Sequence, residues 1–213
     1  MGSTFLYLAR HGETADNAAL VFQGQSGKGL NALGRTQAKR LGQRLARRPP
    51  DAVIASDLER AVETATIVAE ACGREVELDP DLREVDVGHW TGKDHLTIAE
   101  LFPEEWAAWS AGLDVRRGGG ETYAELADRV TRALERVVAK HEGKRVLVVS
   151  HGGAIKSVVA RLLGVGQSGF RALAGVANAG ITLIERDASA RHRLHSWNDT
   201  AHLEGLVVDE QTD

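Results

Sequence analysis

Basic and imidazole side chains follow three predicted strands, and they are the first candidates for chemistry. They are Arg10 and His11 after FLYLA, Arg60 shortly after AVIA, and His151 after RVLVVS. Short apolar runs of this kind predict strands buried on both faces. The carboxyl ends of parallel strands lie along one edge of a sheet, where ligands bind. We therefore expect two guanidinium and two imidazole groups to gather there.

A pocket of this composition favours a phosphoryl group, because arginine forks match phosphate oxygens. The chain as a whole is acidic, with 26 Lys and Arg against 30 Asp and Glu and a formal net charge of -4. This balance gives no general attraction for nucleic acid or for an anionic membrane. The expected partner is a small phosphate monoester bound at a local cationic site.

Nucleotide-binding loops and metal sites fit the sequence poorly. The loop GQSGKG (24–29) has Gly29 after Lys28, where a nucleotide-binding loop needs Ser or Thr, and no G-x-G-x-x-G follows the first strand. His192 and His195 are three residues apart, which places them on opposite faces of a strand. We predict no metal site and no cofactor.

The chemistry left to such a pocket is covalent catalysis by histidine. A neutral imidazole attacks phosphorus and becomes phosphohistidine, which divides one difficult displacement into two easier ones. The second imidazole and the arginines then neutralise charge on the phosphoryl oxygens in the transition state.

Helices and strands alternate along most of the chain. Asn31 caps a predicted helix, Ser56 and Glu59 form the pattern of a capping box that starts another at Ser56, and a longer one covers 121–141. A further helix follows His151. EVEL (75–78) predicts a third strand, and ITLIE (181–185) and RHRLHSW (191–197) predict two closing strands. The fold class is α/β with a mostly parallel sheet.

Length and composition indicate one cytoplasmic domain. The 213 residues, 43% of them hydrophobic, suffice for a single large core. Cys72 is the single cysteine, so no internal disulfide can form, and it fits the apolar face of a helix as a core residue. No signal peptide is expected at the N-terminus, and no apolar run approaches the roughly 20 residues that span a bilayer.

The segment LARHGET (8–14) resembles the L-x-R-H-G-E-T signature of the histidine phosphatase superfamily, the phosphoglycerate mutase-like proteins. Matching stretches occur in order along the chain: GRTQA (34–38), SDLERAVETA (56–65), LREVDVGHWTG (82–92), GGGE (118–121) and SHGGAI (150–155). The resemblance implies a three-layer αβα sandwich with a mostly parallel mixed sheet. It also implies a single domain over 1–213 with a small cap at about 93–120.

The resemblance also implies roles for individual residues. His11 resembles the phosphorylated nucleophile, Arg10 and Arg60 the phosphate clamp, His151 the second histidine on the phosphoryl oxygens, and Glu84 the proton donor to the leaving oxygen. Asn17 resembles a further phosphate ligand, and Gln23, Gly24 and Gly152 correspond to positions near phosphate or substrate.

Within the superfamily, the sequence favours the phosphatase branch over the bisphosphoglycerate-dependent mutases. Glu84 is followed by VDVGHWTG, whereas the resemblance implies an Arg-His-Tyr-Gly type sequence and a long basic insertion in mutases. A non-catalytic phospholigand-binding module is a third interpretation. It is disfavoured because Arg10, His11, Arg60, Glu84 and His151 are all present.

The physiological substrate and the oligomeric state are left open by the sequence. Trp106 and Trp109 are expected to pack the cap onto the core, and Arg116 and Arg117 are expected to be exposed loop arginines, although either could meet a substrate carboxylate. Lys28 is a candidate for binding a second anionic group. Relatives include homodimers, but no exposed apolar stripe argues for one here.

Replacing Glu84 tests its expected role as the proton donor. We expect Glu84→Gln to slow alkyl phosphates far more than aryl phosphates, because only a poor leaving group needs a proton at its ester oxygen. Initial rates on both ester types with each protein are the measurement. Equal slowing of both types would contradict the assignment.

Overall fold

The computed structural model describes residues 2–165 and 170–206, which form one six-stranded mixed sheet flanked by helices. The strand order is β3-β2-β4-β1-β5-β6. The strands are β1 (Thr4–Arg10), β2 (Ala52–Ala55), β3 (Val76–Leu78), β4 (Arg145–Ser150), β5 (Ile181–Arg186) and β6 (His192–Asp199). The first four in this spatial order run parallel, and β5 and β6 are antiparallel to their neighbours.

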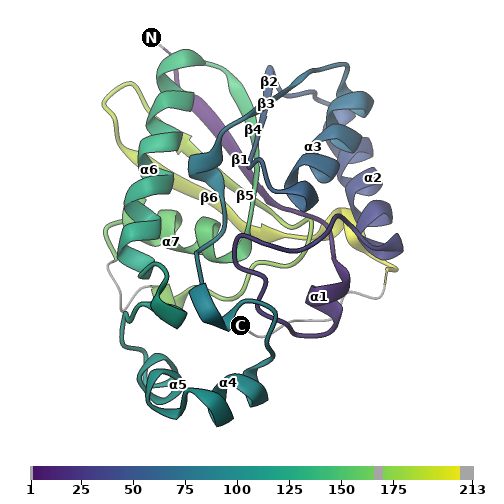
Figure 1. The fold of residues 1–213 in the computed structure, drawn as a ribbon. Coiled ribbons are helices and arrows are strands. Elements are labelled where there is room, and N and C mark those ends of the chain that lie inside the picture. Colours follow the sequence, from purple (N-terminus) through teal and green to yellow (C-terminus); the bar gives the residue numbers. More distant parts are fainter. Residues whose placement is uncertain (1, 166–169, 207–213) are drawn as a thin grey trace.

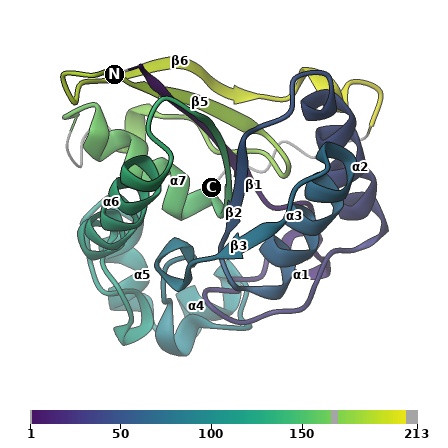
Figure 2. The same cartoon turned by 90° about the horizontal axis from the view of Figure 1, so that it is seen from above.

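Helices cover both faces of this sheet, as Figures 1 and 2 show. On one face lie α6 (Tyr123–Lys140) and α7 (Gly152–Leu162), and on the other lie α2 (Ala32–Ala46) and α3 (Glu59–Cys72). The short helix α1 (Ala15–Ala18) follows β1. The expected three-layer αβα sandwich is confirmed. No described helix is long and apolar enough to cross a membrane.

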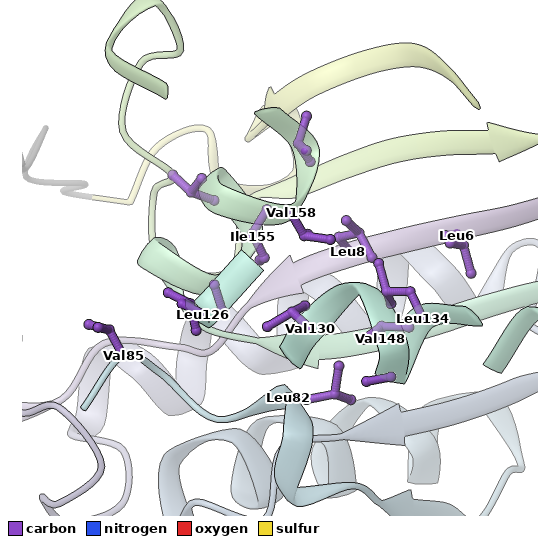
Figure 3. Packing of buried hydrophobic residues seen from close by; sticks show 14 of the residues in the cluster. Leu6, Leu8, Leu82, Val85, Leu126, Val130, Leu134, Val148, Ile155 and Val158 are labelled. Atoms are coloured by element: carbon purple, nitrogen blue, oxygen red, sulfur yellow. The ribbon is translucent and has the colours of Figure 1, made fainter. Parts of the chain in front are cut away.

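Alternating side chains of the central strands explain this arrangement. Along β4, Val146 and Val148 join the core under α6 and α7, whereas Leu147 and Val149 join the core under α2 and α3. Successive side chains of a strand point to opposite faces, so a strand covered on both sides has to be apolar throughout. Figure 3 shows the first of these cores, in which Leu8 and Val148 lie near α6 and α7 residues such as Leu134 and Ile155.

Most of the predicted elements form within one or two residues of their expected ends. Asn31 caps α2 through its side chain, which accepts from the amide of Gly34 at 2.7 Å. The long helix α6 begins two residues later than expected, with Thr122 as its cap. Cys72 is buried in the core under α2 and α3, as predicted.

One helix start was predicted wrongly. Helix α3 begins at Glu59 rather than at Ser56, and its N-cap Leu58 makes no side-chain cap. The capping box does not form; the hydroxyl of Ser56 instead accepts from the backbone amide of Leu58 at 3.3 Å and lies 2.9 Å from the imidazole of His151, 95 residues away. The Ser56 hydroxyl, which the spacing to Glu59 predicted as a helix cap, therefore contacts a residue that is distant in the sequence.

The 93–120 segment lies beyond the carboxyl ends of the parallel strands and contains α4 (His95–Leu101) and α5 (Pro103–Ser110) (Figure 1). Trp106 and Trp109 pack against Trp90 with ring centroids 6.1 Å apart in both cases. Both tryptophans border the core, so the prediction that they pack this segment onto the body is confirmed. Short 3₁₀ turns occupy Pro80–Leu82, Gly88–Trp90, Arg117–Gly119 and Ala201–Leu203.

Candidate active site

The register of the sheet brings the predicted basic residues together at one edge. Ala9 of β1 is level with Val149 of β4, and Val149 is level with Ala55 of β2. The residues that follow these positions therefore emerge side by side, because the three strands run parallel. His11 and His151 have ring centroids 5.1 Å apart, and both side chains are buried.

Arg60 lies between the two imidazoles. Its Nε donates to Nε2 of His11 at 3.2 Å and to Nδ1 of His151 at 3.3 Å. Its other two nitrogens donate to the carbonyls of Ser26 at 2.5 Å and Gly24 at 2.7 Å. The first turn of α3 and the loop after α1 thus hold one buried guanidinium between two histidines.

These contacts assign the tautomers of both rings. An arginine nitrogen can only donate, so Nε2 of His11 and Nδ1 of His151 must accept. The proton of His11 is then on Nδ1, which donates to the carbonyl of Gly12 at 2.7 Å, and the proton of His151 is on Nε2, which donates to Ser56 Oγ. His11 therefore keeps a lone pair on Nε2, as a nucleophile requires.

Burial and neighbouring positive charge keep the imidazoles of His11 and His151 neutral. Burial is the largest cause that lowers the pKa of His11 well below 6.5, and the guanidiniums of Arg60 and Arg10 lower it further. The pKa of His151 is lowered in the same way, first by burial and then by Arg60. Burial also lowers the pKa of Arg60 to about 10, which leaves it charged at neutral pH.

Arg10 and its neighbours complete the cationic pocket. The Nη1 of Arg10 donates to the carbonyl of Val176 at 2.6 Å, whereas its buried Nε has no hydrogen-bond partner in the described chain. A Cβ on Gly152 would lie 3.5 Å from the Arg10 guanidinium, so the start of α7 borders the same pocket.

The other predicted binding residues, Asn17, Gln23 and Gly24, are all buried. Asn17 is buried at α1, where its Oδ1 accepts from the backbone amide of Thr14 at 3.2 Å and from Asn178 Nδ2 at 3.2 Å. Gln23 is buried, and its Oε1 lacks a partner among the described residues. Gly24 contributes the carbonyl that binds Arg60.

The carboxylate of Glu84 lies at the amino end of α7. Its oxygens accept from the backbone amides of Gly153 at 3.0 Å and Ala154 at 3.1 Å, and from its own neighbour Val85 at 2.9 Å. Amides at a helix N-terminus favour a carboxyl group there. Because Gly152 borders Arg10, this contact places Glu84 beside the cationic pocket.

Comparison with known proteins shows the family of this chain. The sequence model of the histidine phosphatase superfamily (branch 1) matches residues 6–200. The chain belongs to this superfamily. It is 38% identical over 208 residues to a metal-independent phosphoserine phosphatase of Arabidopsis thaliana, covering 95% of this chain and 84% of the relative. It is 37% identical to a probable phosphoglycerate mutase GpmB of Erwinia tasmaniensis, covering 96% and 97%.

A solved structure of the superfamily has the same fold. A mycobacterial glucosyl-3-phosphoglycerate phosphatase, determined in complex with VO3, superposes with a TM-score of 0.85 at 33% identity, covering 92% of this chain and 99% of that one. Within the described part of this chain, no group of three or more His, Cys, Asp and Glu residues is placed to hold a metal ion.

Sequence reasoning missed three residues that contact the two histidines or the glycine after His11: Ser56, Asn178 and Thr64. Ser56 follows β2 at the same edge as the other candidates, so the strand-end rule could have identified it. Asn178 Nδ2 donates to the carbonyl of His11 at 3.1 Å, and Thr64 Oγ1 accepts from the amide of Gly12 at 3.0 Å. No local pattern marks these two residues, since their partners are 167 and 52 positions away.

Gly153 provides a test of the position of Glu84. A Cβ at Gly153 would lie 2.7 Å from Oε1 of Glu84, so we expect Gly153→Ala to displace the carboxylate from α7. Turnover of alkyl phosphates should fall by about tenfold or more, and aryl phosphates should change less. Gly152→Ala is the control, because its nearest contact would be an ordinary 3.5 Å. Parallel losses on both ester types would contradict the placement.

The buried histidines predict how stability depends on pH. Their pKa values are lower in the folded protein than in the unfolded chain, so below about pH 6.5 the unfolded chain binds more protons. The free energy of unfolding should therefore fall as pH decreases through 6.5. Urea unfolding at pH 7.5 and 5.5 measures this change. His11→Gln should lose less stability over the interval, and an equal loss would show that His11 does not contribute.

Proposed function

We propose that this protein is a phosphatase that hydrolyses phosphate monoesters of small metabolites through a phosphohistidine on His11. The observation that carries the proposal is the Nε2 lone pair of a buried, neutral His11 beside the guanidinium of Arg60. The names of relatives support the activity: one is a phosphoserine phosphatase and another acts on glucosyl-3-phosphoglycerate. The single buried Cys72 fits a reducing, cytoplasmic setting.

In the first step, Nε2 of His11 bonds to phosphorus and the bond from phosphorus to the ester oxygen breaks. Arg10 and Arg60 stabilise the charge on the phosphoryl oxygens, as preorganised donors do in phosphoryl transfer. The 3.2 and 3.3 Å contacts of Arg60 Nε are long, so anionic oxygens compete well for this donor. Glu84 accepts from three backbone amides as a carboxylate, so it must first take up a proton as the ester binds, and it then gives that proton to the departing oxygen.

His151 assists after a change of protonation. Its Nδ1 accepts from Arg60 while its Nε2–H donates to Ser56, so a neutral His151 has no free N–H for a phosphoryl oxygen. An arriving phosphate dianion favours uptake of a second proton on Nδ1. His151 would then donate to the phosphoryl group.

In the second step, water replaces the histidine on phosphorus. Glu84, now a carboxylate, accepts a proton from the attacking water, and the bond between phosphorus and Nε2 breaks. His11 returns to its neutral form and inorganic phosphate leaves. The same carboxyl group thus acts as acid and then as base.

A phosphoglycerate mutase is the second candidate, because one relative is named as a probable mutase. A mutase must retain the phosphohistidine against water and present it to a second oxygen of the same substrate. The sequence after Glu84 and the short segment before Gly118 favour hydrolysis instead. The non-catalytic module is the third candidate, and the presence of every expected catalytic side chain disfavours it.

Phosphate release from a panel of monoesters tests the proposal. We expect the native protein to hydrolyse some members in the presence of a chelator and without bisphosphoglycerate, and His11→Ala to release none. Rapid quenching at alkaline pH, followed by mass spectrometry, should detect a phosphoryl group on His11. Alkaline quenching is needed because phosphohistidine is acid-labile.

Two other outcomes would replace the proposal. Interconversion of phosphoglycerates on addition of bisphosphoglycerate, with no release from any ester, would make the protein a mutase. Absence of both activities, with retained binding of phosphorylated ligands, would make it a binding module.

A further inference from the structure

Arg117 is a buried guanidinium that the proposed phosphoryl chemistry does not use. The sequence predicts an exposed loop arginine, but the side chain is 3% exposed. Its Nε and Nη2 are buried and have no hydrogen-bond partner in the described chain. Its Cζ lies 3.8 Å from the centre of the Tyr123 ring. A buried arginine without an acceptor is unusual, because charged groups are buried only when they are paired.

Close backbone packing holds Arg117 next to residues 85–88, which follow Glu84 in the chain. Arg117 begins a turn in which Gly118 has φ 55°. A Cβ on Gly118 would lie 2.2 Å from the carbonyl of Val87, and one on Gly88 would lie 1.8 Å from the carbonyl of Gly118. Only glycines permit this approach. Arg117 therefore has little freedom to move away from the Glu84 side of the site.

The carboxylates on the elements around Arg117 are committed to other donors. They are Asp86 with the Gly88 amide, Glu105 with the Trp90 indole and the Gly118 amide, Asp114 with the first two amides of α6, Glu121 with Arg129, and Glu125 with Arg116 and Thr122. None forms an ion pair with Arg117. The positive charge of Arg117 therefore has no carboxylate partner among the described residues.

Two aromatic rings, Tyr123 and Phe170, connect Arg117 to Lys156 of α7. The Tyr123 ring lies 4.1 Å from the Phe170 ring, and the ammonium of Lys156 lies 4.6 Å from Phe170. Lys156 is three residues after Gly153, about 5 Å along the helix from the amide that binds Glu84. Arg117 and these rings are therefore connected, through Lys156, to the helix whose amino end binds Glu84.

The geometry points to Arg117 as the residue that binds a carboxylate on the substrate's leaving group. This inference rests on the proposed function, because it places the phosphoryl group at His11 and the leaving group beside Glu84. The guanidinium over the Tyr123 ring presents a fork of donors, which suits the two oxygens of a carboxylate. The substrate class is then a phosphate monoester that also carries a carboxylate.

Matched pairs of ligands test this inference without turnover. O-phosphoserine and O-phosphoethanolamine differ only in the carboxylate, and 3-phosphoglycerate and glycerol 3-phosphate differ in little else. The pair of 6-phosphogluconate and glucitol 6-phosphate places the carboxylate further from the ester. Calorimetric titration of the inactive His11→Ala protein with each ligand gives the preference of the site, even if no ester is hydrolysed.

We expect His11→Ala to bind the carboxylated member of at least one pair about 10- to 100-fold more tightly, as hydrogen bonds to charged groups allow. Adding Arg117→Met should abolish this preference, so that the two members of the pair bind with about equal affinity. Arg116→Met is the matched control, because Arg116 is exposed and pairs with Glu125. It should leave the preference unchanged. Lys28→Ala tests the other candidate cation, which is exposed on the Gln23 loop.

Three outcomes would overturn the inference: equal affinity of His11→Ala for both members of every pair, a preference that survives Arg117→Met, or its loss in Lys28→Ala alone. If Arg117→Met fails to fold, Arg117→Lys keeps the charge without the fork, and an unchanged preference in that variant would also overturn it. Failure of the proposed function is a separate result, because it concerns phosphate release and not the ratio of affinities.

Discussion

The proposed chemistry depends on one N–H group that two imidazoles share. Because the Nε of Arg60 can only donate, its contacts with His11 and His151 decide where the proton lies on each ring. Burial of this guanidinium is possible because the carbonyls of Gly24 and Ser26 accept from its other nitrogens. The nucleophile is thus ready only when two strand ends, the start of α3 and the loop after α1 are all in place.

Close backbone contacts make this convergence possible. A Cβ on Gly12 would lie 2.4 Å from the carbonyl of Gly34, and one on Gly34 would lie 2.1 Å from the carbonyl of Glu13. The exit of β1 and the first turn of α2 therefore touch through backbone alone. A side chain at position 12 would collide with the backbone of α2, so glycine is required directly after His11. This contact is the physical reason for the glycine in the LARHGET segment.

The two ends of the site are built by different kinds of structure. The phosphoryl end comes from the exits of β1, β2 and β4, whose spacing is determined by the hydrogen bonds of a parallel sheet. In the proposed reaction the leaving-group end is formed by Glu84 and by Arg117 of the 93–120 segment, and this segment packs through tryptophans and glycine-rich turns. Such a division allows the reaction to stay constant while the recognised leaving group changes.

The amino-acid sequence by itself determined the strands, most helices and the gathering of Arg10, His11, Arg60 and His151. Apolar periodicity is a local signal, and parallel strands, wherever they pair, have their carboxyl ends at one edge of the sheet. Tertiary structure decided which polar groups meet. Ser56 satisfies a helix-capping pattern, yet its hydroxyl goes to an imidazole that β4 brings beside it. The burial and unpaired state of Arg117 likewise depend on segments that are distant in sequence, and spacing within one segment carries no information about such contacts.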